Sequence, residues 1–169
     1  MSQQLVVDGL AFAQQGKAMT GKVPLQRLAR LLDQLESSEG AVEFALTGRT
    51  GAKGEPLLEL VVRGVVPLRC QRCLGRIDQA LDLRQVFELR DEADDDLLAQ
   101  EDLEDDSRDF IAASRSLDVV SLIEDEVLLG LPLVARHEQC SLPESARNPE
   151  AASPFGVLRS LSKPTGKTH

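Results

Sequence analysis

The stretch over residues 42–90 constrains the fold most, because its apolar residues recur with the period of a β-strand. Val42, Phe44 and Leu46 alternate with small or polar residues and predict a first strand. After a glycine-containing loop over residues 48–54, the apolar run Leu57–Arg63 predicts a second. Strands that follow one another through short turns pair as antiparallel neighbours with one face covered. The sequence therefore predicts an antiparallel β-meander.

Two further strands complete this meander. Gly64 interrupts the apolar run, and Val65–Cys70 predicts a short third strand. Pro67 indicates that this strand is an edge or contains a bulge, because proline has no N–H to donate to a neighbour. The last strand, Ile77–Arg90, shows the clearest alternation. Its apolar face carries Ile77, Leu81, Leu83, Phe87 and Leu89, and its other face is charged.

Helical spacing appears on both sides of the strands. Asp8 can cap a short helix over Gly9–Gln15, and Gly16 can end it. An amphipathic helix is predicted over Pro24–Glu36, since leucines recur there at three- and four-residue intervals. They are Leu25, Leu28, Leu32 and Leu35.

A second long helix is predicted near the C-terminal end, with Asp118 as its cap, Leu131 near its end and Pro132 stopping it. Between this helix and the last strand, residues 91–109 hold eleven acids and one base, which predicts a flexible acidic loop.

The expected fold is therefore α+β, an antiparallel β-meander packed with amphipathic helices. Residues 1–140 are expected to form one domain that contains the acidic loop, and residues 141–169 a polar tail with a short helix over about residues 154–163. No apolar run is long enough to span a membrane, and the N-terminus lacks the features of a secretory signal. Three cysteines fit secretion poorly, so we expect a cytoplasmic protein.

The cysteines form the most specific motif in the chain. Cys70-Gln-Arg-Cys73 lies between two predicted strands and is typical of a zinc knuckle, in which a tight turn faces two thiolates toward one cation. His137 and Cys140 follow the long helix and can supply the remaining two ligands of a tetrahedral site. Such a zinc would be structural, because four protein ligands leave no open position. Buried reduced thiols, or a redox pair of the C-x-x-C type, are the alternatives.

Four segments together resemble the YceD family of large ribosomal RNA subunit accumulation proteins. They are the Cys70–Cys73 motif after a valine-rich strand, the acidic-apolar helix Ser121–Val134 that ends in Leu-Pro, the His137 and Cys140 pair, and Ser153–Leu161 with its Pro-Phe-x-x-Leu-x-x-Leu pattern. The segments keep the order of the family and cover most of the chain. One feature departs from some relatives, which carry several more cysteines in the tail.

This resemblance implies an accessory factor for the accumulation, processing or assembly of 23S ribosomal RNA and the large ribosomal subunit. Ribosomal RNA, or a ribosome-assembly or RNA-processing protein, is the expected partner, with no membrane and no small-molecule substrate. The alternative is a zinc-knuckle adaptor that binds proteins without touching RNA.

The candidate contact residues for RNA or a partner are Arg69, Arg72 and Arg76 around the hairpin and Phe155 and Leu158 in the tail. Catalysis is not expected. The glycines at 48, 51 and 54 do not form a phosphate-binding loop, because Lys53 is followed by glycine and not by serine or threonine. The carboxylates lie in charge runs and not in paired settings.

Overall fold

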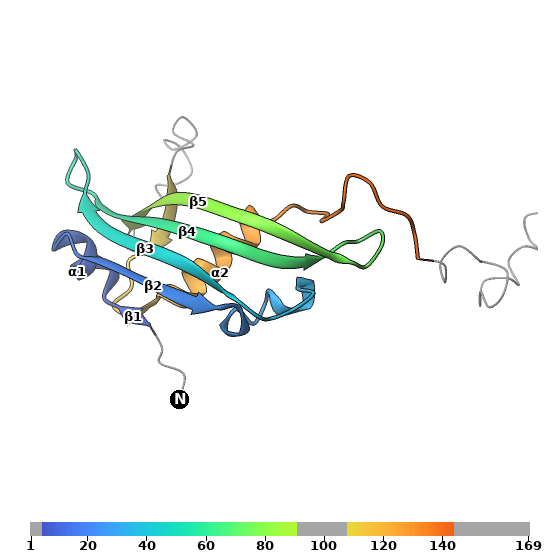
Figure 1. Ribbon diagram of the computed structural model, residues 1–169. Helices are drawn as coiled ribbons and strands as arrows, with labels where there is room; N and C mark the ends of the chain where they lie inside the picture. Colours follow the sequence, from blue (N-terminus) through green and yellow to red (C-terminus); the bar gives the residue numbers. More distant parts are fainter. Residues whose placement is uncertain (1–4, 91–107, 144–169) are drawn as a thin grey trace, which may run out of the picture.

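The computed structural model describes residues 5–90 and 108–143, which form a mixed α+β fold around one five-stranded sheet (Figure 1). The order of the strands is β2-β3-β4-β5-β6, and all neighbours are antiparallel except the pair β5–β6. Their bounds are β2 Ala18–Pro24, β3 Ala41–Thr50, β4 Pro56–Arg69, β5 Arg76–Arg90 and β6 Asp109–Ala112. A separate two-stranded sheet pairs β1 (Val6–Val7) with β7 (Leu117–Asp118). The expected α+β class with a mostly antiparallel sheet is confirmed.

The hairpin of β4 and β5 is the longest element of the sheet. Its register runs without a break from Leu57 opposite Glu88 to Arg69 opposite Arg76. The predicted break at Gly64 is therefore wrong, since β4 passes through it. A Cβ at Gly64 would meet the Cα of Val42 at 3.2 Å, so glycine marks a close approach of β3 and not the end of a strand.

Pro67 lies where β4 has only one strand beside it. The pairing of β3 with β4 ends at Glu43 opposite Arg63, and the Pro67 carbonyl instead accepts a hydrogen bond from the backbone N–H of Glu36 at 2.8 Å. The missing N–H of proline is thus tolerated at an edge of the sheet, as the sequence indicated.

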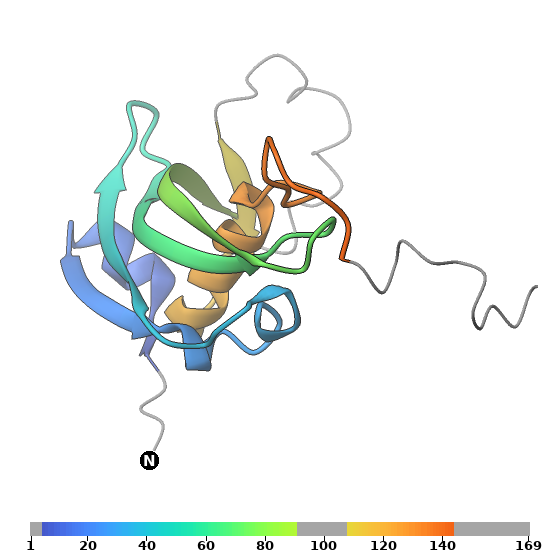
Figure 2. The same cartoon turned by 45° about the vertical axis from the view of Figure 1, so that its right-hand side comes forward.

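Two α-helices cover the sheet, and both begin at a capping aspartate. Asp8 caps α1 (Gly9–Gln14) and Asp118 caps α2 (Val119–Gly130), each accepting a backbone N–H at 2.9 Å. Figure 2 shows the strands curling around α2. Its buried stripe, which includes Ile123 and Val127, packs with the inward residues of β3, β4 and β5 in one apolar core. The helices that the sequence predicts after Asp8 and after Asp118 are therefore both present.

The amphipathic helix expected over Pro24–Glu36 is absent, because Pro24 ends β2 and the chain then forms two 3₁₀ turns, η1 (Leu25–Arg27) and η2 (Leu32–Gln34). The turns are closed by bonds between residues three apart, such as Leu28 N–H to the Leu25 carbonyl at 3.0 Å. Three residues per turn place Leu25, Leu28 and Leu31 on one side. All three are fully buried, whereas Leu32 is 39% exposed. The three- and four-residue spacing of Leu25, Leu28, Leu32 and Leu35 therefore predicted the wrong type of helix.

An ion pair fastens this segment to α2. Arg30 donates from its backbone N–H and its Nε to the two carboxylate oxygens of Glu124, at 2.7 and 2.8 Å, and from Nη1 to Asp125 at 2.6 Å. Glu124 is buried, and this pairing satisfies both of its oxygens. A charged residue on the apolar side of α2 is therefore explained by its partner ninety-four residues away in the sequence.

Other boundaries differ from the sequence-based expectation. The expected loop over residues 48–54 is shorter, because β3 continues to Thr50, and Asp109 belongs to β6 and not to the acidic loop. Strands β2 and β6 were not predicted. The acidic residues 91–107 and the tail helix expected over about residues 154–163 lie outside the described ranges. Within residues 5–90 and 108–143, no helix has the length and apolarity that crossing a bilayer requires.

The two 3₁₀ turns bury Leu31 more deeply than Leu32, whereas the predicted α-helix would place Leu32 on its apolar face. Leu31→Ala should lower the free energy of unfolding by about 2–5 kcal/mol, since it empties a fully buried site. Leu32→Ala should change it by only about 0.5 kcal/mol, because Leu32 is partly exposed. Urea denaturation of both variants measures the difference, and the reverse ranking would contradict the observed turns.

Candidate metal centre

The tip of the β4–β5 hairpin is a tight turn that begins with Cys70. The Cys70 N–H donates to the Gly75 carbonyl at 2.8 Å, and the Leu74 N–H donates to the Cys70 carbonyl at 2.9 Å. Leu74 takes the left-handed conformation, with φ of 62°. This conformation disfavours every residue with a Cβ, so a bulky leucine here is held by its surroundings. The left-handed residue of the turn is thus Leu74 and not the glycine that follows it.

The loop that follows α2 lies against this tip. Leu131 ends the helix, and the Gln71 N–H then donates to the Ala135 carbonyl at 2.8 Å. The side chain of Arg72 donates from Nη1 to the Cys140 carbonyl at 3.1 Å. These two bonds hold residues from opposite halves of the chain together. The second bond gives Arg72 a structural role that the sequence did not suggest.

The contact between tip and loop gathers Cys70, Cys73, His137 and Cys140, here called the Cys-His cluster. Their ligand atoms all lie within 4.8 Å of one another. The Sγ atoms of Cys70 and Cys140 are 3.8 Å apart, and the Sγ of Cys73 is 3.4 Å from the Nδ1 of His137. The prediction that these two distant stretches meet in space is confirmed.

These separations match a tetrahedral zinc site. Bonds of about 2.3 Å to sulfur and about 2.0–2.1 Å to nitrogen place two tetrahedral sulfurs about 3.8 Å apart, and a sulfur and a nitrogen about 3.5 Å apart. The observed 3.8 and 3.4 Å agree with both values. Three thiolates and one imidazole are also donors that zinc prefers. Two of the separations thus fit tetrahedral coordination, and all four donor atoms lie within 4.8 Å of one another, so the cluster could bind a metal ion such as zinc.

His137 is oriented for this purpose by a backbone carbonyl. Its Nε2 lies 2.9 Å from the carbonyl oxygen of Arg76. A carbonyl can only accept, so Nε2 carries the proton and Nδ1 keeps its lone pair on the side of Cys73. Such a partner on the outer nitrogen is the usual means of fixing the tautomer of a metal-binding histidine.

Cys70 is placed as a thiolate. Burial raises the pKa of its thiol, but backbone hydrogen bonds from Cys73, His137 and Arg72 outweigh this effect and lower the pKa from 9.0 to about 5. The N–H groups of Arg72 and Cys73 lie 3.4 and 3.5 Å from its Sγ. Burial and the neighbouring Cys70 and Cys73 sulfurs raise the pKa of the Cys140 thiol. The Cys70 sulfur thus favours the charged form and the Cys140 sulfur the neutral one.

The residues expected to contact RNA or a partner differ in exposure, and two of them lie outside the described residues. Arg69 is exposed at the end of β4, and Arg76 is exposed at the start of β5, where its Nε pairs with Asp78 at 2.7 Å. Arg72 is half-buried against the loop. Phe155 and Leu158 lie outside the described residues. Three arginines therefore surround the Cys-His cluster, of which two face solvent.

Exposed apolar side chains also surround the cluster, and the sequence did not single them out. Leu74 is 60% exposed, Val134 61% and Leu142 51%, and Leu133 is fully exposed. All four adjoin the turn or the loop that carry the ligands. The sequence offers one indication, a leucine at a position in the turn where a glycine or a polar residue is usual. That alone does not predict an exposed apolar surface at the hairpin tip.

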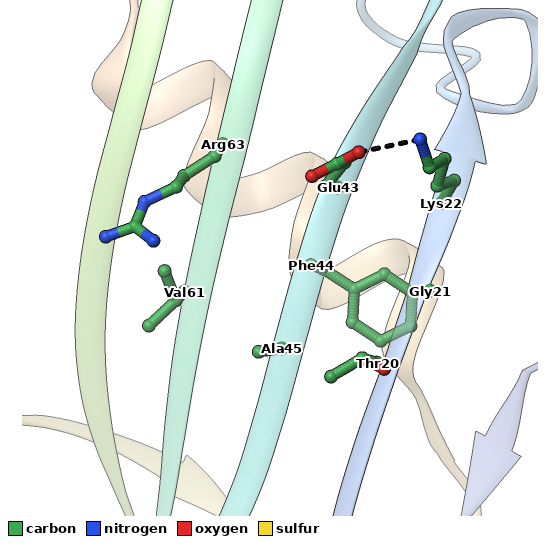
Figure 3. Close-up of a pocket in the computed structure, with 8 residues that line it drawn as sticks. All are labelled: Thr20, Gly21, Lys22, Glu43, Phe44, Ala45, Val61 and Arg63. Atoms are coloured by element: carbon green, nitrogen blue, oxygen red, sulfur yellow. Dashed lines mark ion pairs between the residues drawn. The ribbon is translucent and has the colours of Figure 1, made fainter.

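A hollow of about 370 Å³ lies across β2, β3 and β4, away from the hairpin tip (Figure 3). Thr20, Ala45 and Val61 contribute small side chains to its wall. Lys22 pairs with Glu43 at 2.7 Å on the neighbouring strand, and Arg63 pairs with Asp82 at 2.8 Å. The cations of this hollow are thus held in exposed cross-strand pairs, which are worth little energetically.

The acidic segment is attached far from the Cys-His cluster. Arg90 and Arg108, which flank residues 91–107, lie at the end of β5 opposite to the hairpin tip. Arg108 pairs there with Glu55 at 2.9 Å. The two points at which the described chain borders residues 91–107 are therefore separated from the arginines of the hairpin tip by the length of β5.

The chain matches the sequence model of a known protein family. Residues 58–161, more than half of the chain, match the sequence model of the family described as "Large ribosomal RNA subunit accumulation protein YceD". The matched range contains the whole Cys-His cluster. No curated protein and no solved structure matches the chain.

The lowered pKa of Cys70 makes a prediction for the metal-free protein. Its ultraviolet thiolate absorbance should rise as one thiol titrates near pH 5, because the charged form is favoured above that value. Cys70→Ser should remove this step, whereas Cys140→Ser should retain it. A single transition near the ordinary thiol pKa in the wild-type protein would contradict the proposed hydrogen bonding to Cys70.

Proposed function

Since the chain belongs to the YceD family of large ribosomal RNA subunit accumulation proteins, we propose that it is a cytoplasmic accessory factor for 23S ribosomal RNA. In this role it would support the accumulation, processing or assembly of that RNA into the large subunit. The observation that carries the proposal is the match over residues 58–161, which spans both segments that meet at the Cys-His cluster.

The proposal includes one structural zinc in the Cys-His cluster. Two separations of tetrahedral size, between Cys70 and Cys140 and between Cys73 and His137, and the fixed tautomer of His137 support it. Zinc there would join two segments whose cysteines lie seventy residues apart. It would hold the loop after α2 against the hairpin tip and so keep the arginines and apolar side chains around it in one arrangement.

The geometry of the proposed zinc site supports an accessory role without catalysis. Four protein donors complete the coordination of zinc and leave no open position for a substrate or a water molecule. Arg72, which lies within the hairpin turn, is engaged with the Cys140 carbonyl. The cluster is thus suited to shaping a surface.

Direct contact with RNA would use the exposed arginines of this surface. Arg69 and Arg76 lie beside the hairpin tip and can reach phosphate oxygens, and binding of this kind weakens as salt increases. Base stacking would contribute little, since the chain has five phenylalanines and neither tryptophan nor tyrosine.

A protein-binding adaptor is the second candidate function, and the exposed apolar side chains favour it. A leucine held in the left-handed conformation and 60% exposed costs stability without contributing to the core. Strain of this kind is often retained where a side chain serves binding. Together with Val134 and Leu142 it would offer an apolar patch to a ribosomal or RNA-processing protein.

Deletion of the gene should lower the ratio of large-subunit to small-subunit ribosomal RNA in the cell, as quantified on total RNA.

The purified protein should contain one zinc per chain by elemental analysis. Cys73→Ser should lower zinc affinity by more than about 100-fold, beyond the 10–100-fold loss that outer-shell changes cause. It should also fail to restore the RNA ratio. A normal ratio in the deletion strain would contradict the proposed role, and absence of zinc would contradict the metal.

Two variants separate the RNA contact from the adaptor. Leu74→Gly should leave the melting temperature unchanged or raise it, because glycine relieves a conformational cost of about 1–2 kcal/mol. If the adaptor role is correct, this variant should nevertheless fail to restore the RNA ratio. If RNA is bound directly, Arg69→Ala combined with Arg76→Ala should reduce salt-sensitive binding of ribosomal RNA.

The matched control for the arginine variant is Arg49→Ala combined with Arg84→Ala. Both arginines are exposed on the same sheet, and both pair with Glu59 far from the hairpin tip. Equal loss of RNA binding in the two double variants would show that only overall charge matters. It would then remove the hairpin tip as the contact surface.

A further inference from the structure

The sulfurs of the Cys-His cluster fall into two unequal pairings. The Sγ atoms of Cys70 and Cys140 face each other at 3.8 Å, while Cys73 faces the Nδ1 of His137 at 3.4 Å. A disulfide has a sulfur–sulfur bond of about 2.05 Å, so Cys70 and Cys140 need to approach by somewhat less than 2 Å. All three cysteines are free thiols in the structure.

The loop that carries Cys140 permits such an approach. Residues 132–143 form neither a helix nor a strand, and most of their side chains are exposed. Cys140 is half-buried and Cys70 is fully buried, while backbone N–H groups of Arg72 and Cys73 stabilise the charge on the Cys70 sulfur. Exposure favours Cys140 as the first sulfur to be oxidised and thiolate character favours Cys70, and in either order the other sulfur lies close enough to resolve the product.

We propose that Cys70 and Cys140 form a peroxide-sensitive oxidation site, whose disulfide replaces the metal as the link between the hairpin tip and the loop after α2. One of the two sulfurs attacks one oxygen of hydrogen peroxide, the O–O bond breaks, and a sulfenic acid and water form. The other sulfur then attacks the sulfenic sulfur, the S–O bond breaks, and a second water leaves. Two thiols are oxidised and one peroxide is reduced.

The disulfide has two consequences for the cluster. It removes two of the four donors and leaves Cys73 and His137, which are too few for a structural zinc site. It also joins the same two segments covalently, so the surface around the cluster stays assembled after the metal has left. Oxidation would thus exchange one cross-link for another without unfolding this end of the protein.

This inference rests on the proposed Cys-His cluster and does not depend on the role in RNA accumulation. The alternative product is a disulfide between Cys70 and Cys73 within the hairpin turn. It would also release zinc, but it would leave the loop after α2 unattached. The position of the disulfide therefore decides between the two.

The test uses the full-length reduced protein loaded with zinc and treated with increasing hydrogen peroxide. Zinc release is followed with a chromogenic chelator, and the disulfide is located by peptide mass spectrometry without reduction. We expect one zinc released for each disulfide formed and Cys70–Cys140 as the main product. A thiol reductant with added zinc should restore the starting state. A main product of Cys70–Cys73, an intermolecular disulfide, or three thiols oxidised without any disulfide would each overturn the proposal.

Further measurements keep the outcome interpretable. Zinc-free Cys73→Ser should form the same Cys70–Cys140 disulfide, since Cys73 takes no part in it. The oxidised wild-type protein should melt at a higher temperature than the reduced zinc-free protein, whereas a Cys70–Cys73 product would not stabilise the loop. If the protein binds no zinc but forms the disulfide, the metal proposal fails and the oxidation site stands. If zinc binds and peroxide yields no Cys70–Cys140 disulfide, the reverse holds.

Discussion

The uninterrupted pairing of β4 with β5 is the constraint on which the rest of the structure depends. It runs from Leu57 opposite Glu88 to Arg69 opposite Arg76, places one long hairpin at the centre of the sheet, and sets which face of each strand is buried. A slip of one residue would turn every apolar side chain of β5 to the other face. The same register closes the turn at Cys70, so the core and the geometry of the ligand-bearing tip are set together.

The Cys-His cluster lies at the tip of this hairpin, where the apolar core does not hold the loop after α2 in place. The loop after α2 contacts the tip through few backbone bonds, and much of its apolar surface faces solvent. A metal bound by both segments would supply the missing link, and a disulfide between the same segments would supply it in another chemical form. Either link would hold Leu74 and the neighbouring arginines in a defined surface, which fits a factor that acts through contacts.

Local patterns predicted the elements whose signals are complete within a few residues. The caps Asp8 and Asp118 and the alternation along β5 belong to this kind, and the structure has them where they were expected. The error over Pro24–Glu36 arose because leucines three residues apart suit a 3₁₀ turn as well as an α-helix. Only the pairing of β2 with β3 and the anchoring of Arg30 to Glu124 exclude the helix. Strand β6 was missed because it is short and its partner lies across the acidic segment.

The sequence by itself determined which donors the protein has and that a C-x-x-C turn presents two of them, because turn geometry depends on adjacent residues. It also determined that the charge is concentrated in one segment. Only the tertiary structure decided that Cys140 lies 3.8 Å from Cys70, that the Arg76 carbonyl fixes the tautomer of His137, and that Leu74 is left-handed and exposed. These features depend on contacts between segments about seventy residues apart in the sequence, which no local pattern encodes.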